Sequence, residues 1–100
     1  MNMLNSCILE GYVISMEILK DRTVLIFGSE RTYKNSEDKP EIQTSIFELH
    51  CFGQIAETAK KLKTNQMFRT CGRLSMVENR TVLICEHLEM SKNFHKEVTQ

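Results

Sequence analysis

A single amphipathic helix interrupts a chain that otherwise reads as β-strands, and this order of elements restricts the fold more than any other feature. Five stretches alternate polar with apolar residues, or run apolar with many β-branched residues, as strands do. These stretches cover residues 6–15, 22–32, 42–52, 66–77 and 80–90. The helix is predicted over residues 55–62, because Ile55, Ala56, Ala59 and Leu62 form one apolar stripe at helical spacing. Five strands with one helix between the third and fourth is the order of an OB-fold, a five-stranded Greek-key barrel whose helix covers one end.

The connections and the alternation give further expectations. Residues 33–41 are polar, contain the only proline and predict an exposed loop, and residues 78–80 predict a tight turn. Asn65 is expected to take a left-handed conformation after the helix. The alternation predicts a core that includes Phe47, Leu49 and Cys51, together with Leu9, Leu25, Phe27, Phe68 and Leu74 or their neighbours on the same face.

The charge balance and the cysteine spacing limit the classes of function. Lys and Arg number 13 and Asp and Glu number 13, so the formal net charge is zero, and a nucleic-acid partner would need a local basic face. The four cysteines include no C-x-x-C pair, which favours buried, reduced thiols over a zinc site or a disulfide framework. No acid–base or nucleophile motif and no Gly-rich phosphate loop is present. We expect a protein that is not an enzyme and uses no metal, cofactor or small-molecule substrate.

Length and the N-terminal segment predict the domain organisation and the location. One hundred residues suffice for one domain, which we place at residues 1–90, with a short frayed tail at 91–100. The start, MNMLNSCILEGYV, lacks the basic segment and cleavage site of a secretory signal. No apolar run approaches the roughly 20 residues that span a bilayer. We expect a cytoplasmic protein without a membrane partner.

Three motifs resemble the bacterial single-stranded DNA-binding protein family. They are Asn5-x-x-x-Leu9-x-Gly11, Phe52-Gly53-x-x-Ala56-Glu57 and Gly72-Arg73-Leu74, in the family's order and at its spacing. The chain departs from the family by having no tryptophan, by carrying Asn65 at the family's turn glycine, and by lacking its acidic C-terminal tail in the printed sequence. The resemblance implies a homodimer or homotetramer that binds single-stranded DNA without sequence preference. It also implies a nucleoid-associated role in DNA replication, recombination and repair, with replication and repair proteins as partners.

Candidate DNA-binding residues follow from the two needs of single-strand binding, which are aromatic faces for stacking and cations along the backbone. Phe52 occupies the family's aromatic position, and Tyr33 with Lys34 is expected at an exposed loop. His50 shares a strand face with Phe52, and Arg69 shares one with Arg73. The remaining candidates are Arg31 and Arg80. Each has an ordinary alternative: Phe52 as a core residue, Tyr33 as a surface tyrosine, and the polar and basic positions as solvated surface.

Two other functions remain open from the sequence. A primosomal replication protein of the same fold also binds single strands, although that family generally lacks the aromatic-Gly-x-x-Ala-Glu pattern. An OB-fold that contacts proteins and has lost DNA binding would account for the zero net charge and the absence of tryptophan.

Overall fold

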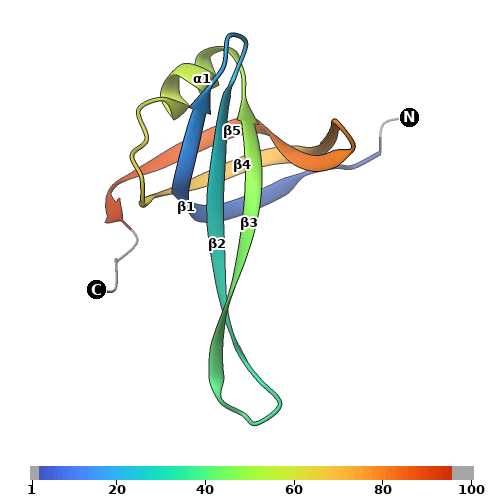
Figure 1. The fold of residues 1–100 in the computed structure, drawn as a ribbon, viewed down its shortest axis with the longest axis vertical. Coiled ribbons are helices and arrows are strands. Elements are labelled where there is room, and N and C mark those ends of the chain that lie inside the picture. The colour runs from blue at the N-terminus through green and yellow to red at the C-terminus, as the bar shows by residue number, and fades with distance from the viewer. Residues whose placement is uncertain (1–2, 96–100) are drawn as a thin grey trace.

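The chain forms a closed five-stranded barrel with one short helix, as the order of elements predicts. The computed structural model describes residues 3–95 (Figure 1). The elements are β1 (Cys7–Ile18), β2 (Thr23–Lys34), β3 (Pro40–Cys51), α1 (Gly53–Ala59), β4 (Gln66–Val77) and β5 (Arg80–His95). Around the barrel the strands follow the order β1-β2-β3-β5-β4. This is the architecture of an OB-fold, so the predicted fold class is confirmed.

Alternating side chains of all five strands fill the barrel. The ring of Phe27 lies at its centre, with ring centroids 5.1 Å from Phe68 and 5.6 Å from Phe47. The predicted core residues Leu25, Phe27, Leu49, Cys51 and Phe68 are buried, while Leu9 and Phe47 pack partly buried against them. The prediction is wrong for Leu74, which is 46% exposed. At that point the β4–β5 hairpin has already left the barrel, so an inward-facing position no longer faces the core (Figure 1).

The helix covers the end of the barrel at which β1 and β2 connect (Figure 1). It begins and ends earlier than predicted, but Ala56, Ala59 and the following Leu62 are buried in the core as the apolar stripe requires. Asn65 has a φ of 70°, and its N–H donates to the Val13 carbonyl oxygen at 2.8 Å. The predicted left-handed turn is therefore present, and it fixes the chain as it enters β4.

Two strands pair well beyond the barrel. The β2–β3 ladder continues to the pair of Lys34 with Pro40, so the loop predicted over residues 33–41 is wrong in extent and occupies only residues 35–39. The Asn35 Oδ1 atom accepts hydrogen bonds from the backbone N–H groups of Glu37 and Lys39 and closes this loop. Residues 29–45 project from the barrel as a two-stranded ribbon, called here the β2–β3 arm (Figure 1).

The chain's last strand is also longer than predicted. β5 continues to His95 rather than ending at residue 90, because its ladder with β4 extends to the pair of Gln66 with His95. Residues 96–100 of the predicted tail lie outside the described residues.

Candidate nucleic-acid interface

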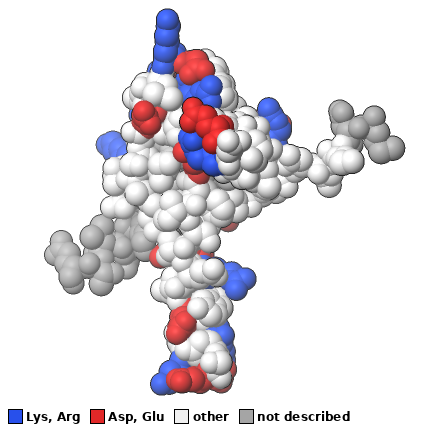
Figure 2. Space-filling model, turned by 45° about the vertical axis from the view of Figure 1, so that its right-hand side comes forward, with Lys and Arg blue, Asp and Glu red and all other residues white. Residues whose placement is uncertain are grey.

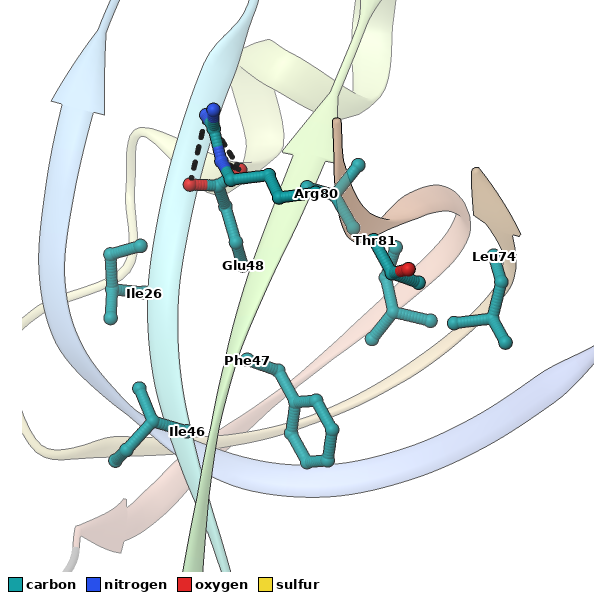
Figure 3. A pocket seen from close by; sticks show the side chains of 9 residues that line it. Ile26, Ile46, Phe47, Glu48, Leu74, Arg80 and Thr81 are labelled. Atoms are coloured by element: carbon teal, nitrogen blue, oxygen red, sulfur yellow. Dashed lines mark hydrogen bonds and ion pairs between the residues drawn. The ribbon is translucent and has the colours of Figure 1, made fainter. Parts of the chain in front are cut away.

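A groove opens where β3 and β5 separate. These two strands pair in parallel only at Leu49 with Leu83 and at His50 with Ile84. On the N-terminal side of these pairs, β3 continues into the β2–β3 arm while β5 turns back into the β4–β5 hairpin. The space between them has a volume of about 320 Å³. It is lined by Ile26, Ile46, Phe47, Glu48, Leu74, Arg80, Thr81, Val82 and Leu83 (Figure 3).

The walls of the groove are mostly apolar. Phe47 extends from β3 toward the β4–β5 hairpin, and Leu74 lies across from it (Figure 3). Ile46 is 57% exposed, although it sits on a regular strand. Exposed apolar and aromatic walls such as these suit the flat face of a base. The β4–β5 hairpin that forms one wall ends in a turn at Glu78 and Asn79, where φ is positive at both residues, 49° and 66°, as in a two-residue hairpin turn.

The polar end of the groove is a chain of hydrogen bonds from β5 to β3. Arg80 Nε donates to Glu48 Oε2 at 3.1 Å (Figure 3), and the Nε2 atom of His50 lies 2.8 Å from the same oxygen. The hydrogen bond from His50, helped by the one from Arg80, lowers the pKa of Glu48 below its ordinary value of 4.5. Glu48 is therefore a carboxylate at neutral pH, and it shares the guanidinium of Arg80 with Glu78, whose carboxylate lies 3.2 Å from Nη1.

His50 lies inside the protein rather than on a binding face. It is 3% exposed, and its Nδ1 atom lies 3.1 Å from Nη1 of Arg22. A guanidinium only donates and a carboxylate only accepts, so His50 is the neutral tautomer with its proton on Nε2. Both ring nitrogens are engaged, and we do not include His50 in the proposed interface.

Phe52 is half exposed at the end of β3. The guanidinium of Arg22 lies 4.7 Å from its ring centroid, within the range of a cation–π contact. The predicted stacking residue therefore has one neighbour on its ring already, and Arg22 links it to His50. The Arg22 contact was not predicted, because residues 22 and 52 come together only through the pairing of β2 with β3.

The β2–β3 arm carries a second group of predicted residues. The guanidinium of Arg31 lies 5.8 Å from the ring centroid of Tyr33, whose hydroxyl donates to Glu41 at 2.8 Å. Lys34 forms an exposed ion pair of 3.6 Å with Asp38. Acidic and basic side chains lie side by side at the tip of the arm, so the arm is not a uniformly basic surface (Figure 2).

Register connects the arm to the groove. In the β2–β3 ladder the pairs Phe27–Phe47, Arg31–Gln43 and Tyr33–Glu41 are separated by even numbers of residues, and such pairs lie on one face of a strand ribbon. Arg31 and Tyr33 therefore share a face with Phe47, which lines the groove, while Ile46 and Glu48, which also line it, belong to the opposite face of the ribbon. From Phe47 to the Tyr33 pair this face extends about 20 Å at the usual rise per residue.

Arg69 and Arg73 lie elsewhere. They are exposed on β4, on the face opposite to Leu74, and Arg69 forms an ion pair of 3.3 Å with Glu10 of β1. The guanidinium of Arg73 has no side-chain partner among the described residues. Gly72 between them is required for packing, since a Cβ there would collide with the carbonyl oxygen of Ile84.

The predicted residues thus divide into four groups. Arg80 borders the groove, Arg31, Tyr33 and Lys34 lie on the arm, and Arg69 and Arg73 occupy a separate face. His50 and Phe52 lie at the end of β3, both in contact with Arg22. Apart from Arg80, the residues that line the groove were not predicted as site residues: Ile26, Ile46, Phe47, Glu48, Leu74, Thr81, Val82 and Leu83. One feature of the sequence could have indicated the groove. Ile46 is apolar at a position of β3 where the alternation predicts a polar, outward-facing residue.

Two kinds of feature are absent from the described part of the chain. Within residues 3–95, no three His, Cys, Asp or Glu side chains are grouped so as to hold a metal ion. In the same residues, no helix has the length and apolar character needed to cross a membrane.

Comparison with known proteins gives matches of structure but not of sequence. No family model and no curated protein sequence matches the chain. The SSB of Plasmodium falciparum in complex with ssDNA superimposes with a TM-score of 0.73 at 15% identity, covering 92% of this chain and 98% of that one. A small single-stranded DNA-binding protein of Mycoplasma pneumoniae gives 0.66 at 20% identity, with 92% and 99% covered. The PriB protein of Ralstonia solanacearum gives 0.68 at 13% identity, with 88% and 98% covered. At these identities the likeness establishes the fold: the chain is an OB-fold similar to small SSB-type proteins.

Proposed function

We propose that this protein binds single-stranded DNA without sequence preference, along the groove and the adjoining face of the β2–β3 arm. The observation that carries the proposal is the continuous face formed by Phe47, Arg31 and Tyr33, which joins an apolar groove to a cation–aromatic pair. Single-strand binding requires this combination of stacking surfaces and cations. The solved SSB complex with ssDNA, which has the same fold, supports the proposal.

The remaining elements of the proposal follow from the family resemblance. The protein acts as a homodimer or homotetramer in the cytoplasm, without catalysis, in DNA replication, recombination and repair. A PriB-like role is the alternative within the same fold. The structural match to PriB supports this alternative as much as the matches to the SSB proteins support the first role.

The test is fluorescence anisotropy with a labelled oligo-dT, longer than the roughly 4–16 nucleotides that one OB-fold occupies. It is repeated with duplex DNA and at several salt concentrations. We expect binding to the single strand alone. If Arg31, Lys34 and Arg80 each contact one phosphate, log K falls against log salt with a slope of about −2.

A pair of matched variants locates the binding face. Tyr33 is exposed on the arm, whereas Ile8 is exposed on β1, where it pairs with Cys71 of β4 and does not line the groove. Tyr33→Ala should weaken binding by about 1–3 kcal/mol, the loss expected for one stacked base, whereas Ile8→Ala should leave it unchanged. Equal effects of the two variants would contradict the proposed path.

A protein-contact function is the second candidate, because acidic residues neutralise most of the candidate cations. Arg69 pairs with Glu10, Arg80 with Glu48 and Lys34 with Asp38. If the folded protein binds no oligo-dT at low salt, this candidate replaces the first.

A further inference from the structure

Two buried cysteines face each other across the seam between β3 and β5. The parallel register pairs Leu49 with Leu83 and His50 with Ile84, so its next step places Cys51 opposite Cys85. Cys51 is 0% and Cys85 6% exposed, and both belong to the same core cluster. Both are free thiols in this structure.

The spacing of a sheet suits a covalent link at this position. Neighbouring strands lie about 4.8 Å apart, and the Cα atoms of disulfide-bonded cysteines lie about 4.4–6.8 Å apart. Both side chains point to the interior, like Leu49 and Leu83 on the same face. The half-buried Cys7 and Cys71 lack this arrangement, because Cys7 pairs with Gly72 and Cys71 with Ile8, and successive residues of a strand point to opposite faces.

The surroundings make the two thiols chemically different. A hydrogen bond between them lowers the pKa of Cys85 and raises that of Cys51. The hydroxyl of Thr70 donates to the carbonyl oxygen of His87 at 3.0 Å and lies 3.3 Å from the Cys85 sulfur. Cys85 is therefore the nucleophile of the pair and Cys51 the resolving thiol.

We propose that Cys51 and Cys85 form an oxidative modification site, at which a peroxide converts the two thiols into a disulfide that joins β3 to β5. The Cys85 thiolate attacks one peroxide oxygen, the O–O bond breaks, and the leaving hydroxide takes up a proton as water. Cys51 loses its proton and attacks the resulting sulfenic sulfur; the S–S bond forms, the S–O bond breaks, and a second water leaves. Two thiols are oxidised by two electrons, and one hydrogen peroxide is reduced to two waters.

Access to the buried pair requires local opening of the helix that covers this end of the barrel. α1 has 7 residues, which is too short for a helix to be stable without its packing. Such segments open locally at a lower free energy than global unfolding requires. The inference does not depend on the proposed DNA binding.

The experiment treats the folded double variant Cys7→Ser/Cys71→Ser with hydrogen peroxide, so that Cys51 and Cys85 are the only thiols. We expect the intact mass to fall by two hydrogen atoms, and peptide mapping to find Cys51 joined to Cys85. The midpoint of thermal unfolding should rise by about 5–15 °C and return on reduction with dithiothreitol, because the link constrains the unfolded chain.

Two further variants, with the unmodified protein as the control, make the result decisive. Cys85→Ser, made in the same background, should stay unoxidised at Cys51, whereas Cys51→Ser should trap Cys85 as a sulfenic acid detectable with dimedone. If either serine variant fails to fold, the corresponding alanine variant replaces it. The proposal is overturned if both thiols of the double variant stay reduced under peroxide that oxidises Cys7 and Cys71 in the unmodified protein. It is equally overturned if the unmodified protein forms its disulfide through either of those half-buried residues.

Discussion

Removing the one carboxylate of the groove should strengthen DNA binding while it weakens the fold. Glu48 lines the groove, where it accepts hydrogen bonds from Arg80 and from the buried His50. In Glu48→Gln the amide oxygen can still accept from His50, so the local geometry is kept. The negative charge is lost, however, and of its two carboxylate partners Arg80 keeps only Glu78, at 3.2 Å.

The size of each effect follows from these contacts. A charge about 7 Å from a phosphate in water contributes about 0.6 kcal/mol of repulsion, or roughly a threefold change in Kd. Arg80, then held by Glu78 alone, is freer to contact a phosphate, and one such added contact makes the salt slope steeper by up to about 0.7. We therefore expect the Kd for oligo-dT to fall about 3- to 10-fold at low salt. Exchanging a charge-assisted hydrogen bond at His50 for a neutral one should lower the free energy of unfolding by about 1 kcal/mol.

Anisotropy titrations and urea unfolding measure the two effects on the same preparation. The matched control is Glu10→Gln, which frees Arg69 from its ion pair on a different face and changes the net charge equally. An equal gain in affinity from both variants would show a general charge effect. A loss of affinity in Glu48→Gln alone would show that the carboxylate itself contacts DNA, and would refute the reasoning.

Three further predictions concern stability. The pKa of Glu48 is lowered in the folded state, so its contribution to stability is complete above pH 4.5 and is lost as the pH falls through the folded pKa; acid unfolding of Glu48→Gln should depend less on pH in that range. Gly72→Ala should cost about 1–3 kcal/mol in urea unfolding, because its Cβ meets the Ile84 carbonyl. Gly53→Ala, which has open space but a φ of 58°, should cost only about 1 kcal/mol. Asn65→Gly should be close to neutral and Asn65→Ala destabilising by about 1–2 kcal/mol, as differential scanning calorimetry can show.

The order of elements and most of the core could be predicted because both depend on local periodicity. Leu25, Phe27, Leu49 and Cys51 alternate with residues that face outward, and the helical stripe differs clearly from that pattern. The extent of the strands could not be predicted. The outer part of the β2–β3 arm is exposed on both faces, so it lacks the alternation that marks a half-buried strand, and its polar residues 33–41 predict a loop.

The groove could not be predicted, because it arises from the separation of two strands that are distant in the sequence. Phe47 was predicted as core, and it does contact Phe27, yet its edge faces the gap that β5 leaves open. His50 was placed on the outer face by alternation. The side chain of Arg22 covers it, and nothing in the local sequence of β3 indicates that contact.

The short seam between β3 and β5 has a consequence for the order in which the barrel assembles. The pairs of β2 with β3 and of β4 with β5 are hairpins of neighbouring segments, and the entropy lost in closing such short loops is small. Two seams between segments distant in the sequence complete the barrel: the parallel pairs of Leu49 with Leu83 and His50 with Ile84, and the antiparallel pairs of β1 with β4. We therefore expect the barrel to close late, and the rate of folding to be set by these long-range contacts rather than by either hairpin.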